Sequence, residues 1–174
     1  MAGQSHTWSR LASAVGYPEE GWTHTLACAA GTGADVQVEE ALGAFGLEVA
    51  PLSLRALQQA YVEAFDLDPA STLDIGWHLF GDGPDRGMFL LFVREALERA
   101  GVAETGELPD HLGHLLRLLG RESDADAADL ARLIAPAVGR VRDGLVSRRS
   151  PYRHVLAAIH RLLEEAAARE EVHP

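Results

Sequence analysis

The sequence contains no lysine and a single cysteine among its 174 residues, so arginine supplies every Lys/Arg-type positive charge. Cys28 alone cannot form an intramolecular disulfide or a cysteine-based metal cluster. Aromatic residues make up only 6% of the chain, which favours helices over a β-sandwich or barrel. No apolar run approaches the roughly 18 residues of a membrane-spanning helix, and residues 1–10 lack the apolar core of a signal peptide. We therefore expect a cytoplasmic protein without stable membrane insertion.

Motifs of catalysis and of nucleotide or metal binding are also missing. The chain has no Walker A sequence, no His-Glu-x-x-His pair and no Cys-x-x-Cys pair. Gly31-Thr32-Gly33 has no predicted strand before it and no third glycine or lysine after it, so it indicates a turn. His111 and His114 lie three residues apart beside Asp110, but no helical metal-binding motif includes them. We expect no catalytic residues, no metal and no bound cofactor.

Acidic residues dominate the charged part of the sequence. The 26 Asp and Glu residues outnumber the 15 arginines, so the net charge is −11 and the pI is about 5.1. This excess repels a phosphate backbone, which argues against nucleic acid as a partner and against a helical transcription regulator. It is compatible with a basic peptide or protein partner.

Apolar residues recur with a helical period of 3.6 in every periodic segment and never with a period of two. We therefore predict an all-α fold, a single-domain bundle of about eight helices over residues 1–174. The chain is long enough to bury about 70% of its unfolded surface without covalent staples. The segments predicted to be helical are 5–15, 22–29, 36–46, 51–65, 75–80, 89–97, 109–119, 122–141 and 152–168.

Particular residues set the expected limits of these helices. Pro51 and Pro109 are each expected at a first helical position, where the missing N–H costs nothing. Pro136 is expected to kink or split the long helix. The segment 71–74 resembles a capping box with aspartate in place of glutamate. The helix over 89–97 carries apolar residues around half of its circumference, so we expect it to be central.

Asp110 and His111 stand at the start of a helix whose leucines share one face. A polar pair at the open end of a buried helix can hold a ligand, or it can be an ordinary cap with a histidine at the core edge. The residues themselves leave both interpretations open. The helix dipole disfavours a protonated His111, so we expect a neutral imidazole beside an ionised Asp110 that can pair with a partner's arginine.

Three motifs resemble the NarJ branch of the NarJ/TorD/DmsD family of molybdoenzyme maturation chaperones: Leu73-Asp74, His78 to Gly87, and Glu107 to Leu112. Residues 61–66 and 16–18 are similar to other segments of that family, and the likeness covers residues 8–120 in order. It implies an all-helical chaperone, not an enzyme, over residues 1–174. Such a chaperone binds the N-terminal or twin-arginine-type signal peptide of a molybdenum oxidoreductase catalytic subunit. It assists cofactor insertion and assembly, as in nitrate reductase, before membrane attachment or export.

The resemblance also implies a peptide groove at these motifs. Asp110 and His111 would edge it, and Gly81, Asp85 and Arg86 would form a facing loop. Helix-in-groove recognition needs an apolar channel as well. The predicted peptide-binding residues are Tyr61, Trp77, Phe80, Gly81, Asp85, Arg86, Glu107, Pro109, Asp110, His111 and Leu115.

Structural roles compete with several of these assignments. Tyr61 suits the core of its helix, and Asp85 with Arg86 suits a local ion pair. The competing functional class is a small helical hydrolase or nucleotide-binding protein that uses the glycine-rich loop Gly81–Gly87. We expect the protein to be a monomer or a weak dimer.

Overall fold

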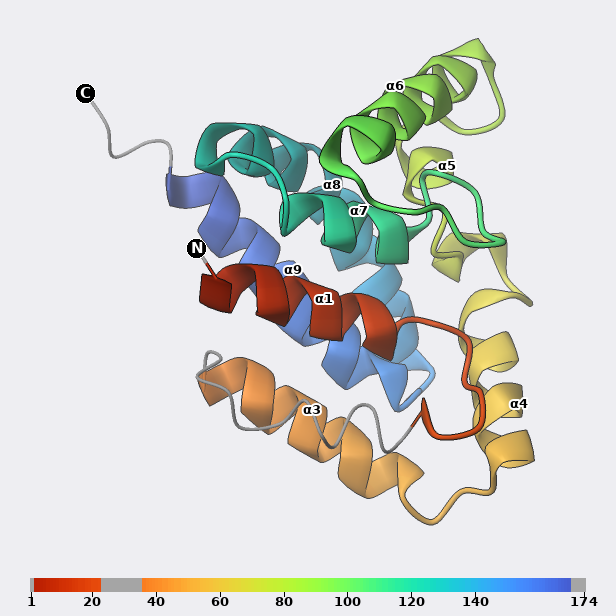
Figure 1. The fold of residues 1–174 in the computed structure, drawn as a ribbon. Coiled ribbons are helices and arrows are strands. Elements are labelled where there is room, and N and C mark those ends of the chain that lie inside the picture. The colour runs from red at the N-terminus through yellow and green to blue at the C-terminus, as the bar shows by residue number, and fades with distance from the viewer. Residues whose placement is uncertain (1, 23–35, 170–174) are drawn as a thin grey trace.

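The computed structural model describes residues 2–22 and 36–169 and confirms an all-α fold (Figure 1). Its only extended pairing in these ranges is an isolated antiparallel bridge between Asp74 and His111. The predicted helix over 22–29, Gly31–Gly33, Cys28 and the tail after residue 169 lie wholly or mostly outside the described residues. The described helices are α1 (Ala2–Ala14), α3 (Val36–Val49), α4 (Leu54–Phe65), the 3₁₀ turn η1 (Pro69–Ser71), α5 (Ile75–Phe80), α6 (Pro84–Ala100), α7 (Leu112–Leu119), α8 (Asp124–Ser147) and α9 (Tyr152–Ala168).

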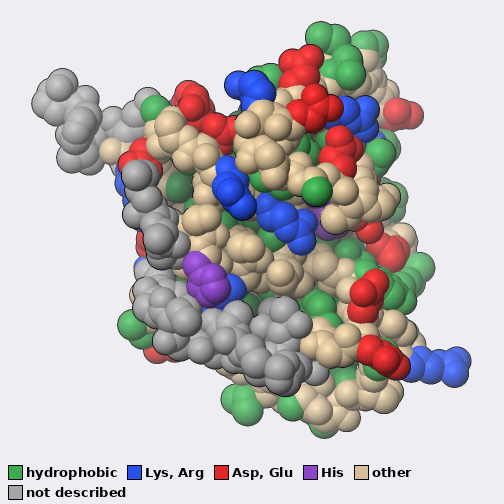
Figure 2. Space-filling model, in the orientation of Figure 1, with side chains coloured by type: hydrophobic (Ala, Val, Ile, Leu, Met, Phe, Trp, Pro, Cys, Tyr) green, Lys and Arg blue, Asp and Glu red, His purple; other side chains and the backbone are tan. Residues whose placement is uncertain are grey.

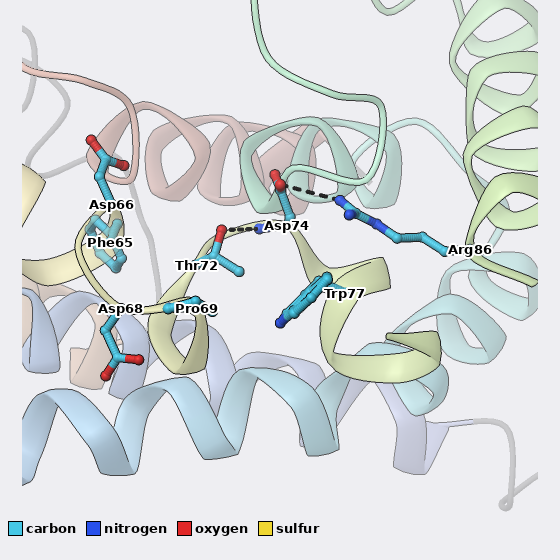
Figure 3. Close-up of a pocket in the computed structure, with 8 residues that line it drawn as sticks. All are labelled: Phe65, Asp66, Asp68, Pro69, Thr72, Asp74, Trp77 and Arg86. Carbon is cyan, nitrogen blue, oxygen red and sulfur yellow. Dashed lines mark hydrogen bonds and ion pairs between the residues drawn. The ribbon is translucent and has the colours of Figure 1, made fainter. Parts of the chain in front are cut away.

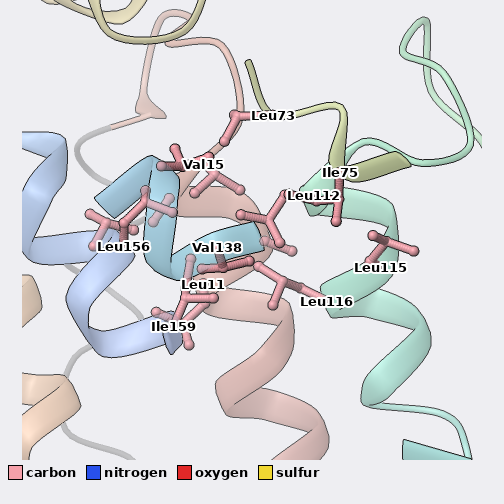
Figure 4. Packing of buried hydrophobic residues seen from close by; sticks show 14 of the residues in the cluster. Leu11, Val15, Leu73, Ile75, Leu112, Leu115, Leu116, Val138, Leu156 and Ile159 are labelled. Carbon is pink, nitrogen blue, oxygen red and sulfur yellow. The ribbon is translucent and has the colours of Figure 1, made fainter. Parts of the chain in front are cut away.

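The long helices α8 and α9 pack against each other and form the centre of the bundle (Figure 1). Helix α3 packs on α9, and α1 packs on α7 and α9. Figure 4 shows side chains from α1, α7, α8 and α9 meeting in one apolar cluster. Among them, Leu11, Leu112, Val138 and Ile159 have no exposed surface. Complete burial of such side chains stabilises a fold by about 1.5–3 kcal/mol each, so this cluster fixes the position of α7.

Helix α8 continues through Pro136 and is not split there. The side chains on either side, Ile134 and Val138, are completely buried against the rest of the core. Tertiary packing of an apolar face contributes more to helix stability than propensity does, so it holds the helix together across a missing backbone donor. None of the described helices is both long and apolar enough to cross a lipid bilayer.

Several predicted helix limits were wrong. Helix α4 begins after Ser53, whose hydroxyl accepts a hydrogen bond from the backbone N–H of Ala56, and not at Pro51. Helix α3 continues past Gly46 to Val49. The capping box at 71–74 does not form, because Asp74 occupies the N-cap of α5 without a side-chain capping bond.

Helix α6 is peripheral, not central, and lies at the outer edge of the bundle (Figure 1). Its inner face, which includes Phe89, Val93 and Leu97, is buried. Met88, Leu91 and Phe92 are exposed on the other side. An apolar pattern around half of a helix therefore did not mean burial around half of it.

Candidate functional site

Two motifs that are far apart in the sequence meet at a short backbone bridge before α5 and α7. The Ile75 N–H donates to the Asp110 carbonyl at 3.0 Å, and the Leu112 N–H donates to the Leu73 carbonyl at 2.8 Å. The bridge places Asp74 opposite His111. The residues of the Leu73-Asp74 and Pro109–Leu112 motifs are therefore held in one fixed arrangement.

Helix α7 begins at Leu112, so Pro109 and Asp110 precede it and the predicted start at Pro109 was wrong. Pro109 instead lies in a tight turn that the His111 N–H closes on the Leu108 carbonyl at 3.0 Å. Proline favours the second position of such a turn because its φ angle is already suitable. His111 takes the N-cap position, and its Nδ1 accepts a hydrogen bond from the Gly113 N–H at 3.1 Å.

His111 is a neutral imidazole in this environment. An Nδ1 that accepts a hydrogen bond carries no proton, so any ring proton is on Nε2. Burial, with smaller contributions from His114 and Arg117, lowers the pKa of His111 to about 4. The lowered pKa agrees with the neutral His111 that the sequence predicts. The main cause is desolvation of the ring, however, and not the helix dipole on which that prediction was based.

Asp110 is completely buried, and its charge is balanced by Arg86 from the start of α6. The Arg86 Nε donates to Asp110 Oδ2 at 3.1 Å, while Arg86 Nη2 donates to Asp74 Oδ2 at 3.2 Å. Asp110 Oδ1 has no hydrogen-bond partner among the described residues. Arg86 thus takes the place expected for a partner's arginine, and it bridges two carboxylates instead of pairing with Asp85.

Asp74, the second carboxylate that Arg86 contacts, has an elevated pKa. Burial is the largest cause and the negative charge of Asp110 adds to it, whereas Arg86 acts in the opposite direction. The Asp74 side chain is 28% exposed, so it connects the buried ion pair to the surface. Through its ion pairs with Asp74 and Asp110, Arg86 therefore ties α5, α6 and the turn before α7 together directly beneath exposed residues.

Gly76 allows this close packing, because a Cβ there would lie 2.5 Å from Asp110 Oδ2 and 3.0 Å from a Phe89 ring carbon. We expect Gly76→Ala to lower the free energy of unfolding by about 1–3 kcal/mol, the usual cost of overpacking a core. Thermal and urea unfolding would measure the loss. Gly87→Ala is the matched control, since Gly87 is also helical and nothing lies within 4 Å of an added Cβ. Equal effects of the two substitutions would contradict a special role for Gly76.

A pocket of about 390 Å³ lies beside the bridge (Figure 3). The indole of Trp77 forms one side, and the guanidinium carbon of Arg86 lies 5.9 Å from its ring centroid. Asp74 lines the pocket near Arg86. The remaining lining residues are Phe65, Asp66, Asp68, Pro69 and Thr72.

The acidic side of this pocket was missed by the sequence analysis. Asp66 and Asp68 follow the end of α4, and η1 brings them towards α5. Burial raises the pKa of Asp66, while Asp68 pairs with Arg148 at 3.1 Å. The signal available in the sequence was a pair of aspartates on either side of Leu67, shortly before Trp77.

The predicted peptide-binding residues separate into exposed and buried groups. Trp77 and Arg86 line the pocket, and Phe80 is 39% exposed with its ring packed on Phe89. The other exposed or half-buried members are Gly81, Asp85 and Glu107. Direct contact with a peptide is available to this group.

The buried group supports the site from within. The Tyr61 hydroxyl donates to the Val15 carbonyl at 3.3 Å, and its ring belongs to an aromatic cluster with Phe65 and Tyr152. Leu115 has no exposed surface. Pro109, Asp110 and His111 are likewise buried. These side chains position the exposed residues without reaching the surface themselves.

The glycine-rich segment offers no phosphate-binding loop. Helix α6 begins at Pro84, so Asp85 and Arg86 are helical and only Gly81–Gly83 remain as a connection. Asp85 stands in the first turn, where its carboxylate would oppose a phosphate at the helix N-terminus. Among the residues that the structure describes, no group of three or more His, Cys, Asp or Glu side chains could hold a metal ion.

The chain matches the family model described as nitrate reductase delta subunit over residues 31–168. It is 27% identical over 162 residues to the nitrate reductase molybdenum cofactor assembly chaperone NarJ of Escherichia coli strain K12, covering 90% of this chain and 69% of that relative. It is 26% identical over 170 residues to the probable nitrate reductase molybdenum cofactor assembly chaperone NarJ of Bacillus subtilis strain 168, covering 95% and 92%. Both relatives are named as assembly chaperones and not as enzymes.

Proposed function

The chain belongs to the nitrate reductase delta subunit family, and on this premise we propose that it is a cytoplasmic maturation chaperone for a molybdenum oxidoreductase catalytic subunit. It binds the N-terminal peptide of that subunit, which in an exported client is a twin-arginine-type signal peptide. It keeps the subunit competent for cofactor insertion and assembly, and both steps precede membrane attachment or export.

The observation that carries this proposal is the pocket at the meeting point of the family-like motifs. Trp77 offers a large rigid apolar surface, the kind of side chain that dominates peptide and protein recognition. Asp66 and Asp74 lie on the same lining. A peptide that carries an apolar residue next to an arginine or lysine therefore finds both an aromatic wall and carboxylates within one pocket.

The ion pairs of Arg86 with Asp74 and Asp110 would hold this pocket in shape before a partner binds. Arg86 holds the starts of α6 and α7 through Asp110, and the same arginine lies near the Trp77 ring. Binding surfaces that are already ordered lose less conformational entropy on association. The motif residues thus contribute to recognition mainly by positioning the pocket.

Removing the indole is expected to weaken client binding. We expect Trp77→Ala to reduce the affinity for a synthetic peptide of about 15–30 client N-terminal residues by about 10- to 100-fold, as for a central aromatic contact. Isothermal titration calorimetry with that peptide would measure the change in affinity. Leu47→Ala is the control, because Leu47 is 80% exposed on α3, away from the pocket.

Two outcomes would contradict the proposal. Equal affinities of the Trp77 and Leu47 variants would exclude the pocket as the peptide site. Failure of the wild-type protein to bind any N-terminal peptide of a neighbouring molybdoenzyme would exclude the chaperone function itself.

Salt is expected to weaken the same complex. The net charge of the protein is −11, and exposed charges attract a basic peptide over a Debye length of about 8 Å at physiological ionic strength. Raising the salt from about 50 to 500 mM should reduce the affinity several-fold, and the dependence should be smaller for Asp66→Asn. A salt-independent affinity would exclude a contribution of the acidic surface.

A further inference from the structure

The outer face of α6 carries an apolar ridge that no other described element covers. The ridge consists of Met88, Leu91 and Phe92, whose side chains are 67%, 53% and 57% exposed. Figure 2 shows hydrophobic side chains at the edge of the molecule over α6, with charged side chains beside them. Three large apolar residues at i, i+3 and i+4 form one contiguous helical stripe, which is unlike scattered exposed leucines.

Charged residues flank this ridge symmetrically. Asp85 lies seven residues before Phe92, and Arg99 lies seven residues after it. Both side chains are exposed, and neither forms an ion pair with another described residue. A seven-residue step keeps all of them on nearly the same side of a helix.

We propose that the ridge is a self-association surface, on which α6 of a second copy of this chain packs antiparallel across a two-fold axis near Phe92. In this arrangement Asp85 of each copy lies opposite Arg99 of the other, so the interface forms two equivalent ion pairs. Parallel packing would instead place like charges together. The isologous contact is closed, so it gives a dimer and not a filament.

The shape and size of the ridge fit this occupant. A single helix that projects from the bundle has a convex face, whereas a bound peptide helix needs walls on both sides. The 17 residues of α6 span about 25 Å, so the pair buries less than the roughly 1,200 Å² of a stable complex. The expected dimer is weak and concentration-dependent. It does not depend on the proposed chaperone function.

Sedimentation velocity of the full chain from about 10 μM to 1 mM tests the proposal. We expect the wild-type protein to move from monomer towards dimer over this range, and Phe92→Glu to weaken the association at least tenfold. Leu47→Glu is the matched control and should associate like wild type, because Leu47 is exposed on α3. A wild-type protein that stays monomeric throughout, or a Phe92→Glu protein that still dimerises, overturns the proposal.

Charge exchange tests the antiparallel register. Asp85→Arg and Arg99→Asp should each weaken the dimer several-fold, and the double variant should restore it, since the two pairs re-form with reversed signs. Circular dichroism confirms that the helices persist in each variant. A double variant as weak as both single changes combined overturns the register.

A cysteine at the axis gives an independent readout. In a Cys28→Ser background, Phe92→Cys is expected to form an intermolecular disulfide much faster than Leu47→Cys under mild oxidation, because only position 92 faces its own copy. Equal rates overturn the proposal. A monomeric wild-type protein together with a Phe92→Glu variant that no longer binds the client peptide also overturns the proposal. The ridge would then belong to the client site.

Discussion

Replacing Arg86 with methionine is expected to lower the free energy of unfolding by about 3–5 kcal/mol, the cost of stranding a buried charge. Asp110 has no exposed surface, and Arg86 is its one ion-pair partner among the described residues. Without the guanidinium, this carboxylate must either remain charged in an apolar environment or take up a proton. Urea unfolding at pH 7 would measure the loss.

The pH dependence of this variant identifies the cause. The cost of leaving the buried Asp110 carboxylate without Arg86 exists only while that carboxylate is charged, so acid, which neutralises carboxylates, should reduce this cost. The difference in unfolding free energy between wild type and Arg86→Met should therefore be smaller at acidic pH than at pH 7. Arg94→Met is the matched control on the same helix, because Arg94 pairs with Glu104 at the surface and should matter little. Unchanged stability with lost peptide binding would instead make Arg86 a client contact.

The helices were predictable because their signals are local. The helix predicted over 152–168 agrees with α9, and the segment at 75–80 agrees with α5. In each case, apolar periodicity and a nearby proline or glycine determine the limits within a few residues. The start of α4 shows the remaining error. Pro51 fits a helix start and was predicted to be one, but Ser53 is the N-cap, because its side chain accepts a hydrogen bond from the Ala56 N–H.

The face that a helix buries was less predictable than the helix itself. In α6, Phe89 and Phe92 are equally apolar, yet one is buried and the other is 57% exposed. Periodicity gives the angle between side chains but does not say which angle faces the core when apolar residues surround the axis. That choice depends on where α5 and α7 lie, which is tertiary information.

The candidate site was predicted only in outline for the same reason. The motifs around Asp74 and Asp110 were identified, but their bridge joins residues from separate segments and no local pattern predicts it. Asp110 was expected at the surface of a helix start, whereas the turn at Pro109 directs it inward to Arg86. Asp66 and Asp68 were missed because only the fold brings them to Trp77.

His111 is expected to make the protein sensitive to acid. Its pKa is about 4 in the folded state against 6.5 for an ordinary histidine, because burial penalises the charged imidazole. Between these values the unfolded state binds more protons, so this contribution to stability is complete above pH 6.5 and is lost as the pH falls towards 4. The full effect is about 3 kcal/mol.

Substituting His111 with asparagine should remove this part of the acid sensitivity. Asparagine is a good N-cap residue, so it can still accept the Gly113 N–H while carrying no titrating group. We expect the stability of His111→Asn to fall less than that of wild type between pH 7 and 4.5, measured by urea unfolding at each pH. His6→Asn is the control, since His6 is exposed on α1, and it should follow the wild-type curve. If the His111 variant also follows that curve, the imidazole is not a buried neutral cap, and its place at the start of α7 needs another explanation.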